Sequence, residues 1–220
     1  MATKTSFKID PRSLMVELKA SDPILKRVAD EAMEEAFFLP AVEEMKRDFE
    51  QHKVTQEVGG GLGSPNISGT LEAPFREDED DGDTIANLWG FIGFDVSPEE
   101  ALAPIRDRLD PSHPDGPKMI YKGRDKDKLK YNYEIQAPNE EIIYSETSFP
   151  WAPGLSWLRR MEQGIPGIGH ILNVTDRPSS RSGGGIQIQG TLRSGRFRPV
   201  KYFSNIISNF LRAASGRKKQ

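Results

Sequence analysis

The 220-residue chain contains no cysteine and only three histidines. Without cysteine it can form neither a disulfide framework nor a thiolate metal site. The histidines, His52, His113 and His170, do not lie at a spacing typical of metal ligands, so we expect no metal. No apolar run approaches the roughly 20 residues of a membrane helix, and the first ten residues lack the apolar core of a secretory signal. We therefore expect neither a membrane partner nor secretion.

The sequence also lacks the short motifs of common active sites. It has no G-x-S-x-G nucleophile elbow. The glycine run Gly59–Ser64 is not followed by the Lys-Ser/Thr pair of a phosphate-binding loop. The run Arg181–Gln189 leads into a strand, whereas phosphate loops lead from a strand into a helix. We expect no catalytic residue and no cofactor, with a hydrolase of unrecognised site as an open alternative.

Charge is distributed unevenly along the chain, although the net charge is only −3. Six of the seven residues in Glu77–Asp83 are acidic. No aspartate or glutamate follows Asp176, and the last 44 residues carry ten lysines and arginines. Such asymmetry indicates a charged partner, another copy of the chain, or solvated loops and tails.

A long helical segment is predicted near the N-terminus. Ser21-Asp22-Pro23 is a typical helix start, with a capping side chain followed by proline in the first turn. Pro40 interrupts the segment, so we expect a kink or two helices in tandem. Apolar residues at helical spacing predict that both parts belong to the core: Ile24, Leu25, Val28, Ala32, Ala36, Val42, Met45 and Phe49.

The middle of the chain mixes turn-rich and regular segments. Residues 52–71 are rich in turn-forming residues. Residues 87–96 are apolar on both alternating faces, which predicts a buried strand, with Gly90 and Gly93 at a bulge or a close backbone approach. Residues 97–109 predict a short helix with Ser97 as its cap.

Alternating residues in the next segments predict antiparallel sheet. Residues 130–137 alternate between apolar and polar side chains, and residues 140–146 are the expected partner strand. Residues 154–164 predict a brief amphipathic helix ended by Gly164, and residues 186–189 predict another strand. The C-terminal helix is expected to bury one face: Phe203, Ile206, Ile207, Phe210 and Leu211.

The predicted fold class is therefore α+β. It has a mainly antiparallel sheet, a long N-terminal helical segment, a short internal helix and an amphipathic C-terminal helix. We expect one domain over residues 1–220. Its appendages are an extended arm (1–20), an exposed acidic loop (72–86) and a basic tail (213–220).

Five segments, in this order, resemble neck, tail-completion or head–tail joining proteins of tailed bacteriophages. They are spread over most of the range from His52 to Phe210, while the acidic run and the basic tail are not part of the resemblance. The segments are HKVTQEV, PNISGTL, NLWGFIGF, LSWLRRMEQGIPGIGHIL and SRSGGGIQIQG. The resemblance implies a structural protein without catalysis, located in the virion and in the host cytoplasm during assembly. It also implies a ring, of six copies by expectation, contacting adjacent connector or tail proteins and genomic DNA without sequence recognition.

Four arginines flank the strand at 186–189: Arg181, Arg193, Arg196 and Arg198. Because an unpaired buried charge costs several kcal/mol, we expect them at a subunit interface or facing the DNA channel. A solvated surface is the simpler alternative. A second alternative is a nucleic-acid-binding accessory protein that uses the basic C-terminal third, where Phe197, Tyr202 and Phe203 are interleaved with the charges.

Overall fold

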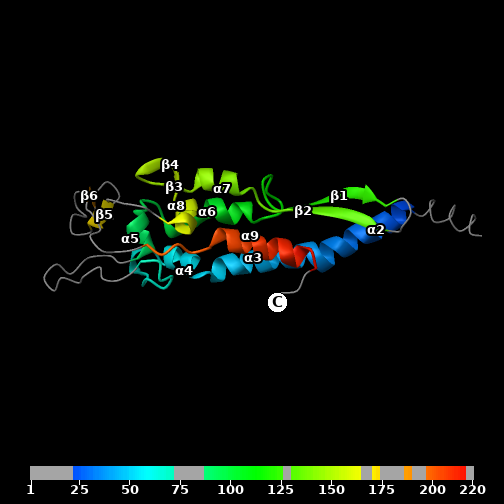
Figure 1. Ribbon diagram of the computed structural model, residues 1–220, viewed down its shortest axis with the longest axis horizontal. Coiled ribbons are helices and arrows are strands. Elements are labelled where there is room, and N and C mark those ends of the chain that lie inside the picture. Colours follow the sequence, from blue (N-terminus) through cyan, green and yellow to red (C-terminus); the bar gives the residue numbers. More distant parts are fainter. Residues whose placement is uncertain are drawn as a thin grey trace, which may run out of the picture.

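A computed structural model describes residues 22–71, 87–125, 130–164, 170–173, 186–189 and 197–216. The described chain is an elongated α+β structure (Figure 1). Its helical elements are α2 (Asp22–Met33), η1 (Glu34–Phe38), α3 (Leu39–Gln51), α4 (Lys53–Gly59), η2 (Gly61–Gly63), α5 (Leu88–Ile92), α6 (Pro98–Arg108), α7 (Glu140–Glu146), α8 (Trp157–Gln163) and α9 (Phe203–Ala214). Its strands are β1 (Lys118–Arg124), β2 (Tyr131–Gln136), β3 (Ser148–Phe149), β4 (Ala152–Ser156), β5 (His170–Asn173) and β6 (Ile186–Gln189).

Within these residues the strands form three two-stranded antiparallel sheets, β1–β2, β3–β4 and β5–β6. The predicted fold class is thereby confirmed. The expected arm at 1–20 and acidic loop at 72–86 lie outside the described residues. Of the expected tail at 213–220, Ala213 and Ala214 still belong to α9, and residues 217–220 lie outside the described part.

The N-terminal helical segment is continuous but contains a π-helical turn. The backbone N–H of Leu39 bonds to the carbonyl of Glu34, five residues back, and Pro40 lies in the first turn of α3. Proline has no N–H to donate, and its ring would collide with the carbonyl four residues earlier in a regular helix. The wider turn just before Pro40 accommodates it, so the expected interruption takes the form of a π-helical turn within a continuous helical segment.

The main core lies where α3 and α9 pack side by side (Figure 1). Phe38 meets the edge of Phe210, with ring centroids 6.4 Å apart, and Phe49 stacks on Tyr202 at 6.1 Å. The apolar face predicted for α3 is confirmed, because Val42, Met45 and Phe49 are buried. On α9 the predicted face is buried except for Leu211, which is 39% exposed.

The predicted strand over residues 87–96 is wrong. Leu88–Ile92 form the short helix α5, capped by Asn87, whose side-chain oxygen accepts the N–H of Gly90 at 2.9 Å. Gly93 ends the helix in the left-handed conformation, with φ of 74°. A five-residue helix surrounded by protein buries residues all round, so its sequence shows no helical period.

The preceding turn-rich segment also contains more helix than expected, namely α4 over Lys53–Gly59. His52 caps α4, because its Nδ1 accepts the backbone N–H of Val54 at 3.2 Å. The fully buried carboxylate of Glu57 accepts the N–H of Leu88 at 2.7 Å and that of Ser68 at 2.8 Å. This one side chain joins α4 to α5 and to the loop before residue 71.

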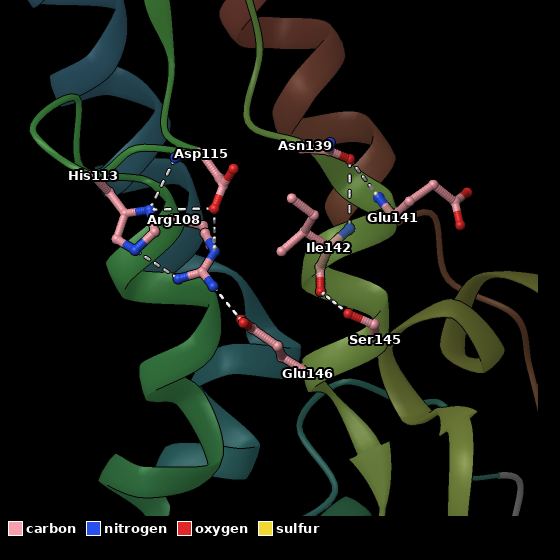
Figure 2. Close-up of polar contacts among 8 residues, drawn as sticks. All are labelled: Arg108, His113, Asp115, Asn139, Glu141, Ile142, Ser145 and Glu146. Atoms are coloured by element: carbon pink, nitrogen blue, oxygen red, sulfur yellow. Dashed lines mark hydrogen bonds and ion pairs between the residues drawn. The ribbon is translucent and has the colours of Figure 1, made fainter.

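The strand over Tyr131–Gln136 is confirmed, but its predicted partner is wrong. It pairs with β1, and residues 140–146 form helix α7 instead. Asn139 caps α7 by accepting the N–H groups of Glu141 and Ile142, as Figure 2 shows. Acidic residues in the first turn favour a helix there, because they face its positive end.

The other two internal helices were predicted, but the one expected over residues 154–164 begins only at Trp157, because residues 154–156 belong to strand β4. Ser97 and Glu100 cap α6 reciprocally in a capping box. Helix α8 buries Trp157, Leu158 and Met161, and the next residue, Gly164, has a φ of 86°.

Candidate interaction surfaces

Of the four arginines expected at an interface, only Arg198 falls within the described residues. Arg181, Arg193 and Arg196 lie outside them, so their arrangement stays a prediction. The backbone N–H of Arg198 bonds to the carbonyl of Thr70 at 2.8 Å, and its side chain is exposed. This bond, together with the bridge between Leu71 and Phe197, fixes where the chain re-enters the core before α9.

The first candidate surface is a projecting arm, formed by α2 and the β1–β2 hairpin at one end of the long axis (Figure 1). Polar contacts hold its two parts together. Asp22 accepts hydrogen bonds from Arg124 and, at 3.0 Å, from the Tyr131 hydroxyl. One turn further on, Lys26 lies 4.6 Å from the centroid of the Tyr121 ring.

The last contact of the arm joins Asp30 to Lys26 and to the Tyr133 hydroxyl, the latter at 2.8 Å. These two hydrogen bonds lower the pKa of Asp30. Desolvation, and then the hydrogen bond to Asp30, raises the pKa of Tyr133. Within the arm, α2 is thus held to the β1–β2 hairpin by two aspartates, Asp22 in its first turn and Asp30 in its last.

The opposite side of α2 carries an apolar stripe that nothing in the described structure covers. Its members on α2 are Ile24, Val28 and Ala32, and Ala36 of η1 continues it; Ile24 is 58% exposed and Val28 53% exposed. Asp22, Lys26 and Asp30 are each offset from the stripe by two positions, about 200° around a helix. The stripe therefore faces away from the hairpin, and no residue of α2 is buried.

The expectation that this stripe belongs to the core is therefore wrong. The helical pattern itself is present, because Ile24, Val28 and Ala32 recur at every fourth position of a real helix. What the sequence could not reveal is that α2 extends beyond the core while α3 lies inside it.

The second candidate surface is an open cleft of about 390 Å³ between α7, β4 and α8. No local sequence pattern indicates this cleft, because three separate segments contribute to it. The only signals were the adjacent arginines on the polar side of α8 and an apolar residue in the preceding strand. The side chains that carry its chemistry are Glu141, Tyr144, Leu155, Arg159 and Arg160.

The two arginines of this cleft differ in their partners. Arg159 donates to Glu141 at 2.7 Å and lies 4.9 Å from the centroid of the Tyr144 ring. Arg160 is half-buried, and no hydrogen bond or ion pair to it is found in the part of the chain that the structure describes. Leu155 is 45% exposed at the same cleft. The cleft therefore offers an apolar contact beside an unpaired guanidinium.

A third polar cluster surrounds Arg108 near the end of α6 (Figure 2). The guanidinium donates to Glu146 of α7 and lies 2.8 Å from Nε2 of His113. Nδ1 of His113 also faces a donor, the backbone N–H of Asp115 at 3.1 Å. A neutral imidazole has only one acceptor nitrogen, so the ring can accept only one of the two bonds. The cluster joins α6 to α7, so we assign it a structural role.

Other polar groups in the interior hold elements together in the same way. Tyr202 is fully buried, shares a hydrogen bond with Thr55, and lies 4.5 Å from the His52 ring. Desolvation raises the pKa of Tyr202.

Within the described ranges, no group of three or more histidines, cysteines or acids could hold a metal ion. None of the described helices is both long and apolar enough to cross a membrane.

Comparison with known proteins gave no match to a family profile, to a curated protein or to a solved structure.

Proposed function

We propose that this chain is a structural subunit of the neck of a tailed bacteriophage, where it forms a ring around the DNA channel. The ordered resemblance of five segments supports the family. The observation that carries an assembly role is the uncovered stripe on α2, where Ile24 and Val28 are more than half exposed. An apolar surface on a projecting helix is typical of a site that another protein covers.

The elongated shape is compatible with a ring. Ring subunits contact each other through two different surfaces, and the arm and the cleft lie in opposite halves of this molecule (Figure 1). The proposed partners are further copies of the chain, six in the simplest ring, together with adjacent connector or tail proteins. Genomic DNA would pass through the ring without sequence recognition, and the subunit would reside in the host cytoplasm until assembly.

The test is whether the protein is part of purified particles, and whether the stripe is needed for that. We expect mass spectrometry to detect the chain at several copies per particle and cryo-electron microscopy to place it between head and tail. Val28→Gln should leave the thermal melt of the free subunit nearly unchanged but reduce its incorporation. Glu43→Gln, an exposed change on α3, is the matched control and should incorporate normally. Particles that lack the chain would refute the proposal.

The alternative, a nucleic-acid-binding accessory protein, rests on the basic C-terminal third. Of its interleaved aromatic residues, Tyr202 and Phe203 are fully buried, and Phe197 stacks on Phe91 with centroids 5.7 Å apart. Binding would therefore depend on charge. Its affinity should fall by about 0.9 log unit per log unit of salt for each phosphate neutralised. A flat salt response would exclude this alternative.

A further inference from the structure

The arm and the cleft are complementary in chemistry. The apolar stripe of α2 continues into an acidic edge, since Glu31 and Glu35 are exposed beside Ala32. Of these, Glu31 has a loose ion pair with Arg27, at 3.8 Å between two well-exposed side chains. Such a pair contributes little and is readily exchanged. The arm thus presents apolar side chains at one end and carboxylates at the other.

The cleft presents the matching groups. Leu155 projects from β4 as an exposed apolar side chain, and Arg160 lacks a partner in the described part of the chain. Arg159 is already occupied by Glu141 and by the Tyr144 ring, so Arg160 is the group available to a new carboxylate. An arginine fork can bind a carboxylate through two parallel hydrogen bonds.

We propose that the arm of one copy docks into the α7–β4–α8 cleft of the next copy. Ile24 and Val28 cover Leu155, and the acidic edge of the arm binds Arg160. This contact would join neighbouring subunits of the proposed ring. It rests on the proposed function in one respect only, namely that repeated contacts close into a ring.

A head-to-tail contact satisfies both surfaces, whereas a two-fold pairing of two arms does not. Pairing arm with arm would cover the stripes but leave Arg160 of both copies without a carboxylate. Because the arm and the cleft lie in opposite halves of the subunit, the arm of one copy cannot fill its own cleft without a large rearrangement (Figure 1). Repeating one head-to-tail contact produces a ring when the rotation closes and a filament when it does not.

The absence of cysteine allows a direct test, because every introduced thiol is unique. One preparation carries Val28→Cys, and a second preparation, distinguished by an affinity tag, carries Leu155→Cys. The two are mixed at high concentration and treated with a short bismaleimide that joins two thiols. We expect a tagged–untagged dimer, and a ladder of multimers from the double variant Val28→Cys/Leu155→Cys. Adding Arg160→Gln to the second preparation should reduce the dimer severalfold.

Ile67→Cys in place of Leu155→Cys is the matched control, because Ile67 is similarly exposed but does not line the cleft. Equal dimer yields for the two positions, or no dimer from either, would overturn the proposal. Efficient dimerisation of Val28→Cys alone would show arm-to-arm pairing and would also overturn it. Circular-dichroism melts verify that each variant is folded.

The Val28→Cys and Leu155→Cys substitutions can also be tested in assembled particles. That experiment distinguishes a failure of arm docking from a failure of the neck assignment. Particles that contain the chain without the Val28–Leu155 cross-link would refute arm docking and leave the neck assignment standing. Particles that lack the chain would refute the neck assignment, and cross-linking of the purified protein would still decide the docking contact.

Discussion

The Glu57 carboxylate accepts the backbone N–H of Leu88 at 2.7 Å, which joins helix α4 to a helix that begins 31 positions later. Its other oxygen accepts the N–H of Ser68 at 2.8 Å. Both bonds need an acceptor, and the site is fully buried. One side chain therefore positions both segments, and a neutral side chain such as glutamine has only one oxygen to accept the two N–H groups.

We predict that Glu57→Gln destabilises the protein, because the amide presents an oxygen to one N–H and an NH₂ group to the other. The expected loss is about 1–3 kcal/mol of unfolding free energy, the usual result of leaving a buried donor unsatisfied. Urea titration measures it. The exposed Glu43→Gln is the control and should change stability by less than about 0.5 kcal/mol. Equal midpoints for the two variants would contradict the structural role of Glu57.

We predict that His52 makes stability depend on pH. Burial lowers the pKa of His52 in the folded protein, so the unfolded chain binds the proton more tightly. Neutral His52 makes its full contribution to the unfolding free energy above the ordinary histidine pKa of about 6.5. That contribution is lost as the pH falls toward the lower pKa of His52 in the folded protein. The melting temperature should thus decrease on acidification from about pH 7.5 to about pH 5.5.

The matched variant is His52→Asn, which can still cap α4 through its side-chain oxygen but does not titrate. We expect this variant to show a smaller decrease in melting temperature over the same range. An unchanged pH dependence would mean that other groups, not His52, cause the loss.

We predict that Gly116→Ala is strongly destabilising. A Cβ atom at this position would lie 2.0 Å from the carbonyl oxygen of Asp110, which is backbone and cannot rotate away. The expected loss is at least about 2 kcal/mol, measured by thermal or urea unfolding. Gly63→Ala is the control, since no atom lies within 4 Å of the added methyl group. A Gly116→Ala variant as stable as this control would show that the turn is placed differently.

The sequence predicted those elements whose ends carry chemical signals. Helix α6 has the capping pair Ser97 and Glu100, and α9 repeats apolar residues over three turns, so both could be located in advance. For α7, the short connection from the preceding strand favoured a hairpin over the helix start that Asn139 and the acidic first turn mark. For α5, five residues are too few to show a period, although Asn87 and Gly93 mark its two ends.

The candidate surfaces were harder to predict than the elements that carry them. The stripe of α2 could be identified as apolar, but its exposure depends on which other segments cover it. Leu155 and Arg160 come from different elements, and the cleft exists only because α7 packs beside them. Exposure and concavity are properties of the tertiary structure that a local pattern does not contain.

The π-helical turn before Pro40 sets the rotational phase between the two halves of the long helix. Val28 and Val42 are fourteen positions apart, which in an uninterrupted α-helix would place them only about 40° apart around the axis. The single extra residue of a π-turn shifts that phase by about 100°, so the stripe of α2 and the buried face of α3 lie on different sides of the long helix. One codon thus sets the direction of the outward stripe: deleting Ala36 would turn α2 by about 100° relative to α3 without changing any residue of either helix.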